Sequence, residues 1–421
     1  QMDMYNNGTE QEKKKLQRMY GEALTLRAQF YFEAIRNWGD LPAHFLPAAT
    51  QSGNDPFPAR VSMDTLYNRL IADLDMAAGL VPWKNEITGI GDPLDERITK
   101  GAVKGLRARL ALFRGGYALR SNGTMQRSAD YQSFYQIVKT ECNEIMTSGQ
   151  HTLNPSFRGL WKDQVCARTL ADPNGELMFQ ASATGGNATA DTKLGYYNGP
   201  RVNNLGNSSV NPLPTYFYLF DSTDTRRDVT VCHYFTSTTG TRIGQPISNM
   251  TDGKYRRNWI TNPVISPTNA IQYFSLKWQI LRYSDVLLMF AEAENELNGP
   301  TTAAYNAINM VRRRGFDKPI STPDPIVDIP AGLSKADFFK YIVRERALEL
   351  GGEGIRKYDL IRWNLLGTAL AESKANMLKM AAVTPMVDPT YMAGYPSYSL
   401  TNTLPASMYL ITNTTADNQN V

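Results

Sequence analysis

The segment 13–38 carries two adjacent apolar stripes, with members three and four residues apart. The first stripe consists of Leu24, Ala28, Tyr31, Ile35 and Trp38, and the second of Leu16, Met19, Ala23, Leu26 and Phe30. Two stripes predict a long helix that is buried on more than one side. Gly39 and the proline three residues later predict that the helix ends there.

Similar apolar spacing recurs along most of the chain, and some segments begin with helix-capping residues. Ser62 precedes Thr65 by three residues, and Ser334 precedes Asp337 at the same spacing. Further helices are predicted over residues 63–80, 97–119, 131–147, 278–298, 301–314, 335–350 and 355–366. Amphipathic helices joined by loops are typical of stacked helical hairpins, although the sequence shows no crisp repeat.

The pattern changes between residues 151 and 273, where Asn, Gly, Thr, Ser and Pro dominate. Short strands are predicted at 176–181 and 229–236, within long loops. Irregular loops carried by a rigid helical frame are the usual place for a binding site. We therefore expect the ligand site in this region.

Composition excludes several classes of function. The net charge is +4, and the only runs of basic residues, at 13–15 and 312–314, are too short for a nucleic-acid stripe. The longest strictly apolar run, 286–291, is too short to span a bilayer. Three scattered histidines and three widely spaced cysteines match no metal or redox motif, so we expect no metal-binding residues and no cofactor.

The densest group of charges is ERALELGGEGIRKYDLIRW, at residues 345–363. Its acids and bases nearly balance, at helical spacing on two segments separated by glycines. Matched charges lower carboxylate pKa values, whereas a general acid needs a raised one. The motif therefore favours an internal ion-pair clasp, in which carboxylates of one helix reach guanidiniums of the other.

This motif resembles the C-terminal signature of the SusD/RagB family of surface glycan-binding lipoproteins. Four other segments resemble further parts of that family and follow in the same order along the chain. They are EALTLRAQFYFEAIRNWGDLP at 22–42, RITKGAVKGLRARLAL at 97–112, FDSTDTRRDV at 220–229 and LRYSDVLLMFAEAENELNG at 281–299.

The resemblance implies a mainly α fold, with a scaffold of about four degenerate tetratricopeptide-type hairpins and an irregular lobe with short β-strands. The scaffold would comprise residues 1–150 and 275–382, and the ligand-binding lobe residues 151–274 and 383–421. It also implies a non-catalytic protein on the extracellular face of a Bacteroidetes outer membrane. Such a protein delivers an oligosaccharide or polysaccharide to a TonB-dependent SusC-like transporter.

In the family, the first long helix lies further from the start of the chain. We therefore expect that the lipid anchor and the segment after it are absent here, and with them some ligand-binding aromatic residues. The loop 184–207 falls where the family often places ligand-facing residues.

Within that loop, Tyr196 and Tyr197 could offer a flat face to a sugar ring. Its polar residues could bind sugar hydroxyls; these residues are Asn187, Asn198, Arg201 and Asn203.

Trp83 follows a helix-ending proline and is another candidate platform. Trp161 and Trp259 lie in predicted loops, where a tryptophan either binds a sugar or fills the core. The other three tryptophans, Trp38, Trp278 and Trp363, are predicted to lie in the core.

Two other functions stay open from the sequence. A glycoside hydrolase would need two convergent carboxylates, and the candidates in the irregular region are Glu176, Asp221 and Asp224. Arg226 and Arg227 follow Asp224 closely, which indicates pairing rather than catalysis. The second alternative is a helical scaffold that binds only other proteins.

Overall fold

The structure, a computed structural model, describes residues 2–45, 58–91, 97–169, 172–183, 192–221, 223–239, 241–245, 249–261 and 264–381. These residues form two compact units. Unit 1 contains the described parts of Gln1–Thr152, Asp285–Ala304 and Lys357–Leu365. Unit 2 contains the described parts of Leu153–Ser284, Tyr305–Arg356 and Leu366–Val421.

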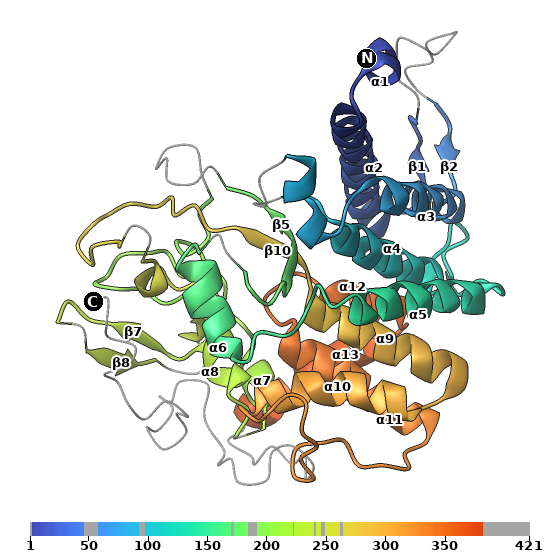
Figure 1. Cartoon of the computed structure of the whole chain (residues 1–421). Coiled ribbons are helices and arrows are strands. Elements are labelled where there is room, and N and C mark those ends of the chain that lie inside the picture. Colours follow the sequence, from blue (N-terminus) through green and yellow to red (C-terminus); the bar gives the residue numbers. More distant parts are fainter. Residues whose placement is uncertain are drawn as a thin grey trace. The chain divides into compact units, whose positions relative to one another are not determined.

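Unit 1 is built from helices that pack against their neighbours in sequence (Figure 1). Its long helices are α2 (Glu10–Trp38), α3 (Met63–Leu80), α4 (Lys100–Arg114) and α5 (Tyr131–Thr147). Helix α2 contacts α3, α3 contacts α4, and α4 contacts α5. The unit also holds α1 (Met2–Asn7), most of α9 (Tyr283–Asn298) and most of α12 (Arg356–Arg362).

Capping residues fix several helix starts where the sequence predicts them. The Ser62 hydroxyl accepts a hydrogen bond from the Thr65 amide, and the Ser334 hydroxyl accepts one from the Asp337 amide. The predictions for 63–80 and 131–147 match α3 and α5. The prediction for 97–119 is too long at both ends, because α4 begins at Lys100 and ends at Arg114, with Gly115 as its C-cap.

Helix α2 buries only one of its two predicted stripes. Leu24 is buried, but Met19, Leu26 and Phe30 are 55%, 41% and 69% exposed. The prediction of burial on more than one side is therefore wrong, because the helices that α2 contacts, chiefly α3, cover the opposite face. Trp38 is 73% exposed and does not belong to the core either.

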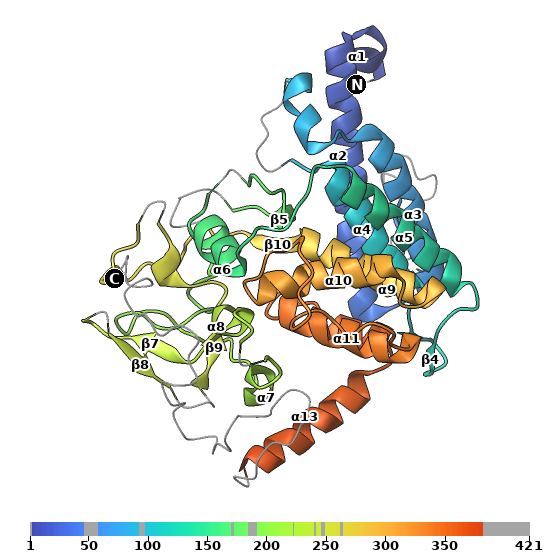
Figure 2. The same ribbon diagram turned by 60° about the horizontal axis from the view of Figure 1, so that its bottom comes forward.

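Unit 2 combines short helices, two-stranded sheets and loops (Figure 2). Its helices are α6 (Phe157–Gly159), η4 (Leu160–Cys166), α7 (Pro214–Phe217), α8 (Arg226–Thr230), η6 (Arg257–Trp259), most of α10 (Thr302–Gly315), α11 (Lys335–Glu349) and α13 (Leu366–Ala381). Most of α10 and all of α11 belong to the same unit as the loop-rich segment. The predicted division into a helical scaffold and a ligand-binding lobe stays a prediction.

The described strands of unit 2 pair in three small antiparallel sheets. Strand β5 (Leu177–Ala181) pairs with β10 (Trp278–Arg282), β6 (Val231–Cys232) with β9 (Thr251–Asp252), and β7 (Tyr234–Thr236) with β8 (Arg242–Gly244). The predicted strand at 176–181 is confirmed, whereas 229–236 contains the end of α8 and two short strands. Unit 1 holds two further pairs, β1 (Leu41–Pro42) with β2 (Arg60–Val61) and β3 (Ala118–Leu119) with β4 (Met125–Gln126), and the short helices η2 (Lys84–Glu86) and η3 (Thr88–Ile90).

Two predicted helices are divided in the structure. Residues 278–282 form β10 instead of the first turn of α9, because they pair with β5 and Gln279 donates to the Gln180 side chain at 3.0 Å. Residues 355–366 form α12 and the start of α13, with Asn364 between them at a φ of 58°.

The core of unit 2 is aromatic. Trp161 and Trp259 are 0% and 1% exposed and pack with Phe157, Tyr255 and Phe274. Both tryptophans therefore fill the core and cannot serve as sugar platforms. Trp278 packs against this cluster, whereas Trp363 is buried in the other unit, as predicted. Within the described part of the chain, no helix combines the length and the apolar character needed to cross a membrane.

Candidate functional site

The charged motif at 345–363 contributes to a buried ion-pair network in unit 2. Helix α11 places Glu345 and Glu349 inside the unit, where both are 0% exposed. The network consists of the acids Glu176, Asp224, Glu345, Glu349 and Glu353 and the bases Arg226, Lys254, Arg282, Arg312 and Arg314. The charges balance, so the motif is an internal clasp, as the sequence indicates.

Glu349 lies at the centre of this network. Its carboxylate lies 2.6 Å from Arg314, 2.9 Å from Arg282 and 3.2 Å from Arg226. Burial alone would raise the pKa of Glu349, but these guanidiniums outweigh it and hold the pKa well below its usual range. Glu349 is therefore a permanently charged structural group.

The partners of Glu345 and Glu349 differ from those expected. The guanidiniums that bind them belong to Arg226, Arg282, Arg312 and Arg314, which all lie outside the motif. The expected pairing between the two helices of the motif is therefore wrong for these two carboxylates. The glycine break has another role, because a side chain at Gly351 would collide with the Tyr216 hydroxyl of α7.

The second half of the motif forms a separate ion-pair group in unit 1. Arg362 of α12 binds the Glu292 carboxylate of α9 through two nitrogens and also binds Asp359. The Trp363 indole donates to Glu292 at 2.8 Å. One sequence motif therefore stabilises the interior of both units.

The carboxylates considered for a glycoside hydrolase do not form a solvent-accessible pair. Asp224 is 0% exposed and is bound twice by Arg226, at 2.9 and 2.7 Å. Glu176 is also 0% exposed and is bound by Arg282 and Arg314. Burial raises the pKa of both acids despite these partners, yet neither is exposed to a substrate. Asp221 accepts hydrogen bonds from its neighbour Thr223.

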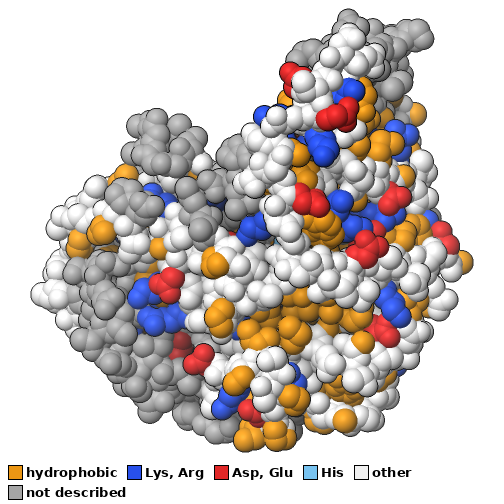
Figure 3. Space-filling view, viewed as in Figure 1, with side chains coloured by type: hydrophobic (Ala, Val, Ile, Leu, Met, Phe, Trp, Pro, Cys, Tyr) orange, Lys and Arg blue, Asp and Glu red, His pale blue; other side chains and the backbone are white. Residues whose placement is uncertain are grey.

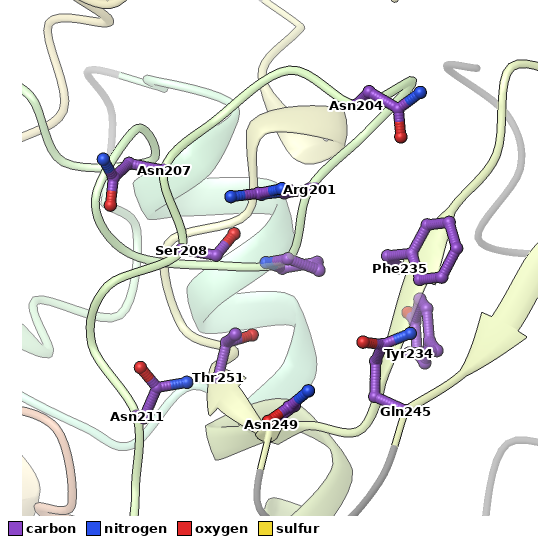
Figure 4. Close-up of a pocket in the computed structure, with 11 residues that line it drawn as sticks. Arg201, Asn204, Asn207, Ser208, Asn211, Tyr234, Phe235, Gln245, Asn249 and Thr251 are labelled. Atoms are coloured by element: carbon purple, nitrogen blue, oxygen red, sulfur yellow. The ribbon is translucent and has the colours of Figure 1, made fainter. Parts of the chain in front are cut away.

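A polar pocket opens elsewhere in unit 2, with a volume of about 360 Å³. Figure 4 shows side chains from three segments around one space: the loop 200–211, the strand β7, and residues 245–251. Its lining consists of Pro200, Arg201, Asn204, Asn207, Ser208, Asn211, Tyr234, Phe235, Gln245, Asn249 and Thr251. Carboxamide and hydroxyl groups therefore dominate the described lining.

Backbone hydrogen bonds hold the loop 200–211 in place. Val202 and Leu205 exchange two hydrogen bonds, and the Asn203 amide donates to the Thr236 carbonyl at 2.8 Å. Gly199 starts the turn with a φ of 77°, and a Cβ there would lie 2.3 Å from the Tyr255 carbonyl oxygen. Only glycine fits this position without a shift of the loop.

Two hydroxyl groups in the lining have no hydrogen-bond partner among the described residues. They are the buried oxygens of Ser208 and Thr251. Thr251 as a whole is only 8% exposed. An unpaired buried hydroxyl costs about 1–3 kcal/mol, so a ligand or an ordered water that pairs with these groups would remove that cost.

The aromatic part of the lining is the strand β7. Tyr234 is buried, and its hydroxyl accepts a hydrogen bond from Arg256 at 2.5 Å. Phe235 is half-buried. Aromatic rings beside amide side chains are typical of a pocket for a sugar ring, which has apolar faces and polar edges.

Of the residues predicted to bind ligand, the structure brings Arg201 into the pocket. Asn203 lies in the same loop, and its side chain donates to the Pro267 carbonyl at 3.3 Å. Asn198 is buried, and its side chain donates to Asp252 at 3.1 Å, so it supports the loop from inside. Asn187 lies outside the described residues.

Tyr196 and Tyr197 do not line the pocket but hold up its loop. Their carbonyl oxygens accept hydrogen bonds from the amides of residues 207–210. The Tyr197 ring is 41% exposed, and the Tyr196 ring packs against it at 5.1 Å. Trp83 belongs to unit 1, where Lys100 lies 5.7 Å from its ring. The roles of both tyrosines and of Trp83 as sugar platforms stay predictions.

Sequence reasoning missed most of the pocket lining. Asn204, Asn207 and Asn211 continue the Asn/Gly-rich loop, so their composition could have indicated them. Tyr234, Phe235, Gln245, Asn249 and Thr251 carry no such signal, because only the folding of the strands brings them to the loop.

Within the described ranges, no group of three or more histidine, cysteine or acidic residues is placed to hold a metal ion. All three cysteines are buried, and none of them forms a disulfide with another described cysteine.

Comparison with known proteins identifies the family. The family model described as "SusD family" matches residues 176–403, more than half of the chain, and a second, "Starch-binding associating with outer membrane", matches residues 2–112. SusD-like protein P38 of Formosa agariphila is 25% identical over 379 residues. That match covers 82% of this chain and 66% of P38, so the chain spans less than two thirds of this relative.

Solved structures share the fold. A SusD homolog from Bacteroides thetaiotaomicron is 24% identical with a TM-score of 0.71, covering 93% of this chain and 75% of that one. A laminarin binding SusD-like protein is 20% identical with a TM-score of 0.61, covering 86% of this chain and 74% of that one. The mainly α, SusD-like fold is therefore confirmed.

Proposed function

Because this chain belongs to the SusD family, we propose that it is a non-catalytic protein that binds glycans at the cell surface. The names of its relatives support this proposal: one matching family model is described as starch-binding and associating with the outer membrane, and one structural neighbour as laminarin binding. The observation that carries it is the pocket, lined by amides, hydroxyls and aromatic rings. In this proposal the protein is lipid-anchored on the outer face of the outer membrane.

The pocket suits binding more than chemistry. Carboxamides both donate and accept hydrogen bonds, which matches the hydroxyls around a sugar ring. No carboxylate is found in its described lining, whereas hydrolysis of a glycosidic bond uses two. The two buried acids considered for catalysis, Glu176 and Asp224, are instead bound by arginines.

Binding is tested with a glycan array, followed by calorimetry on the glycans that bind. We expect the Asn207→Ala variant to bind about three- to tenfold more weakly, the loss expected for one hydrogen bond. Asn143→Ala is the matched control, since Asn143 is an exposed asparagine of α5 and lies outside the pocket lining. A folded protein that binds no glycan on the array would contradict the proposal.

The same samples test for catalysis. We expect no new reducing ends when the protein is incubated with the polysaccharides that it binds, as measured by a reducing-sugar assay. Release of sugar that disappears in the Asp224→Asn variant would support the hydrolase alternative instead. That variant must first show a wild-type melting curve, because Asp224 is part of the buried network.

We also propose that the protein delivers its glycan to a TonB-dependent SusC-like transporter. The proposal follows from the family membership, and a pull-down from outer membranes tests it with and without the glycan. Recovery of a transporter in both conditions is the expected result. Recovery of other proteins alone, without glycan binding, would favour the protein-interaction scaffold.

A further inference from the structure

The described lining of the pocket carries positive charge and no negative charge. Arg201 is the only charged side chain among the described residues of the lining. It is exposed, and its guanidinium has no ion-pair or hydrogen-bond partner within the described part of the chain. Arg226, Arg282, Arg312 and Arg314 of the same unit lie against carboxylates, whereas the donors of Arg201 are directed to solvent or to a ligand.

Cations also lie behind the aromatic wall of the pocket. Arg256 donates to the Tyr234 hydroxyl, and the Arg242 guanidinium lies 4.5 Å from the centre of the Tyr234 ring. Asp228 and Asp252 lie near Arg256 and offset part of its charge, and each also has another partner. Asp228 is bound by Arg227 at 3.0 Å, and Asp252 by the Asn198 amide at 3.1 Å.

The helix formed by α6 and η4 adds two more bases, Arg158 and Lys162. The pKa of each is lowered, first by burial and then by neighbouring cations: Arg256 acts on Arg158, and Arg158 acts on Lys162. Such mutual repulsion indicates a positive potential in this part of unit 2. In Figure 3, Lys and Arg side chains gather, with acidic side chains next to them, over the region where α6 and β7 lie in Figure 1.

The donors in the pocket match an anionic oxygen. A guanidinium binds a carboxylate or a sulfate through two parallel hydrogen bonds, and two unpaired hydroxyls can donate to the same group. Those hydroxyls are Ser208 and Thr251, which line the pocket together with Arg201. A neutral sugar would use the hydrogen bonds but gain nothing from the surrounding positive potential.

Building on the proposed glycan binding, we propose that this pocket selects anionic glycans. The acidic group of the sugar, a carboxylate or a sulfate ester, binds the Arg201 guanidinium and receives hydrogen bonds from the Ser208 and Thr251 hydroxyls. The carboxamides, Asn207 among them, bind the neutral hydroxyls of the same sugar and its neighbour.

The test is an array that carries neutral, uronate-containing and sulfated oligosaccharides, with calorimetry on the strongest binder. We expect the strongest binder to be an anionic glycan. Its affinity should fall as the salt concentration is raised from about 50 to about 500 mM, because salt screens the attraction between charges over this range. The Arg201→Gln variant should bind it at least about tenfold more weakly, whereas Arg201→Lys should retain part of the affinity. Lys193→Gln is the control, because Lys193 is a cation outside the pocket that lies 5.1 Å from the Tyr273 ring.

Chemical modification of the bound glycan distinguishes the two anions. Loss of binding after carboxyl reduction identifies a uronate, and loss after desulfation identifies a sulfate; either result supports the proposal. Strong binding of neutral glycans that is unchanged by Arg201→Gln would overturn it, as would a loss caused by Lys193→Gln alone. Both of these outcomes leave glycan binding itself intact, whereas an array without any binder contradicts the proposed function.

Discussion

The buried ion-pair network and the pocket both consist mainly of polar side chains, and both lie in unit 2, but they differ in how those side chains are paired. Glu349 is bound by three arginines inside the unit. Arg201 and the hydroxyls of Ser208 and Thr251 have no such partners among the described residues. The comparison shows that density of charge leads to the interior of the unit. The binding site that we propose is marked instead by unpaired polar groups in a pocket.

Removing the central acid of the network should have the largest effect. The Glu349→Gln change leaves Arg226, Arg282 and Arg314 buried with one carboxylate fewer. We expect a loss of about 3–5 kcal/mol in the free energy of unfolding, measured by urea denaturation. The control is Lys340→Gln, at a site whose side chain is 75% exposed, where the change should stay below about 1 kcal/mol. If Glu349→Gln, like the control, lowered the free energy of unfolding by less than about 1 kcal/mol, the network would not stabilise the fold.

Lowering the pH should weaken the buried ion-pair network by protonating Glu349. The pKa of Glu349 is lowered in the folded protein, so its charge stabilises the fold above the unfolded value of about 4.3, and this contribution is lost as pH falls below that value. Glu176 and Asp224, whose pKa values burial raises, contribute with the opposite sign.

The pH prediction is therefore measured as a difference between two proteins. We expect the free energy of unfolding to fall less between pH 5 and pH 3, the buffers chosen for the titration, in Glu349→Gln than in the wild-type chain. Parallel curves for both proteins would mean that Glu349 does not titrate differently in the folded and unfolded states.

The pocket loop should respond to a single methyl group. In Gly199→Ala the new Cβ would lie 2.3 Å from the Tyr255 carbonyl oxygen at a φ of 77°, so the loop must shift. We expect a loss of about 1–3 kcal/mol in stability, with weaker glycan binding. Gly367→Ala is the matched control, because no atom lies within 4 Å of its added Cβ. Equal melting temperatures for the two variants would contradict the conformation of the loop.

No loss of stability is expected at the pocket hydroxyls. Thr251→Val removes a buried hydroxyl without a partner among the described residues, so stability should rise, by up to the cost of about 1–3 kcal/mol of an unpaired hydroxyl. Thr25→Val removes an equally buried hydroxyl that donates to the Gly21 carbonyl at 2.7 Å, and it should cost about 1 kcal/mol. Glycan affinity should fall only in Thr251→Val. A larger loss of stability at Thr251 than at Thr25 would show that the Thr251 hydroxyl is already paired.

Much of the helical fold could be predicted from local sequence. Ser62 and Ser334 mark helix starts that the structure confirms, because capping depends on neighbouring residues alone. Apolar periodicity predicted the wrong structure or burial where contacts with distant parts of the chain determined it. Residues 278–282 became a strand through pairing with β5, and Phe30 stayed exposed although its stripe is apolar.

The same distinction applies to the site. Arg201 could be proposed from the composition of its loop and does line the pocket. Tyr234, Phe235 and Thr251 could not, since they reach the loop only through the strand pairs β7–β8 and β6–β9. Asn198 has the same composition signal as Arg201, yet its amide is bound to Asp252 in the interior.

The sequence by itself determined the family, most helix boundaries and the structural character of the charged motif. These depend on spacing and charge balance within short segments, which a linear pattern contains. Only the tertiary structure decided which charges pair with Glu345 and Glu349, and which polar side chains stay unpaired around a pocket. The physical reason is that burial and hydrogen-bond pairing are properties of neighbours in space, which the order of residues does not specify.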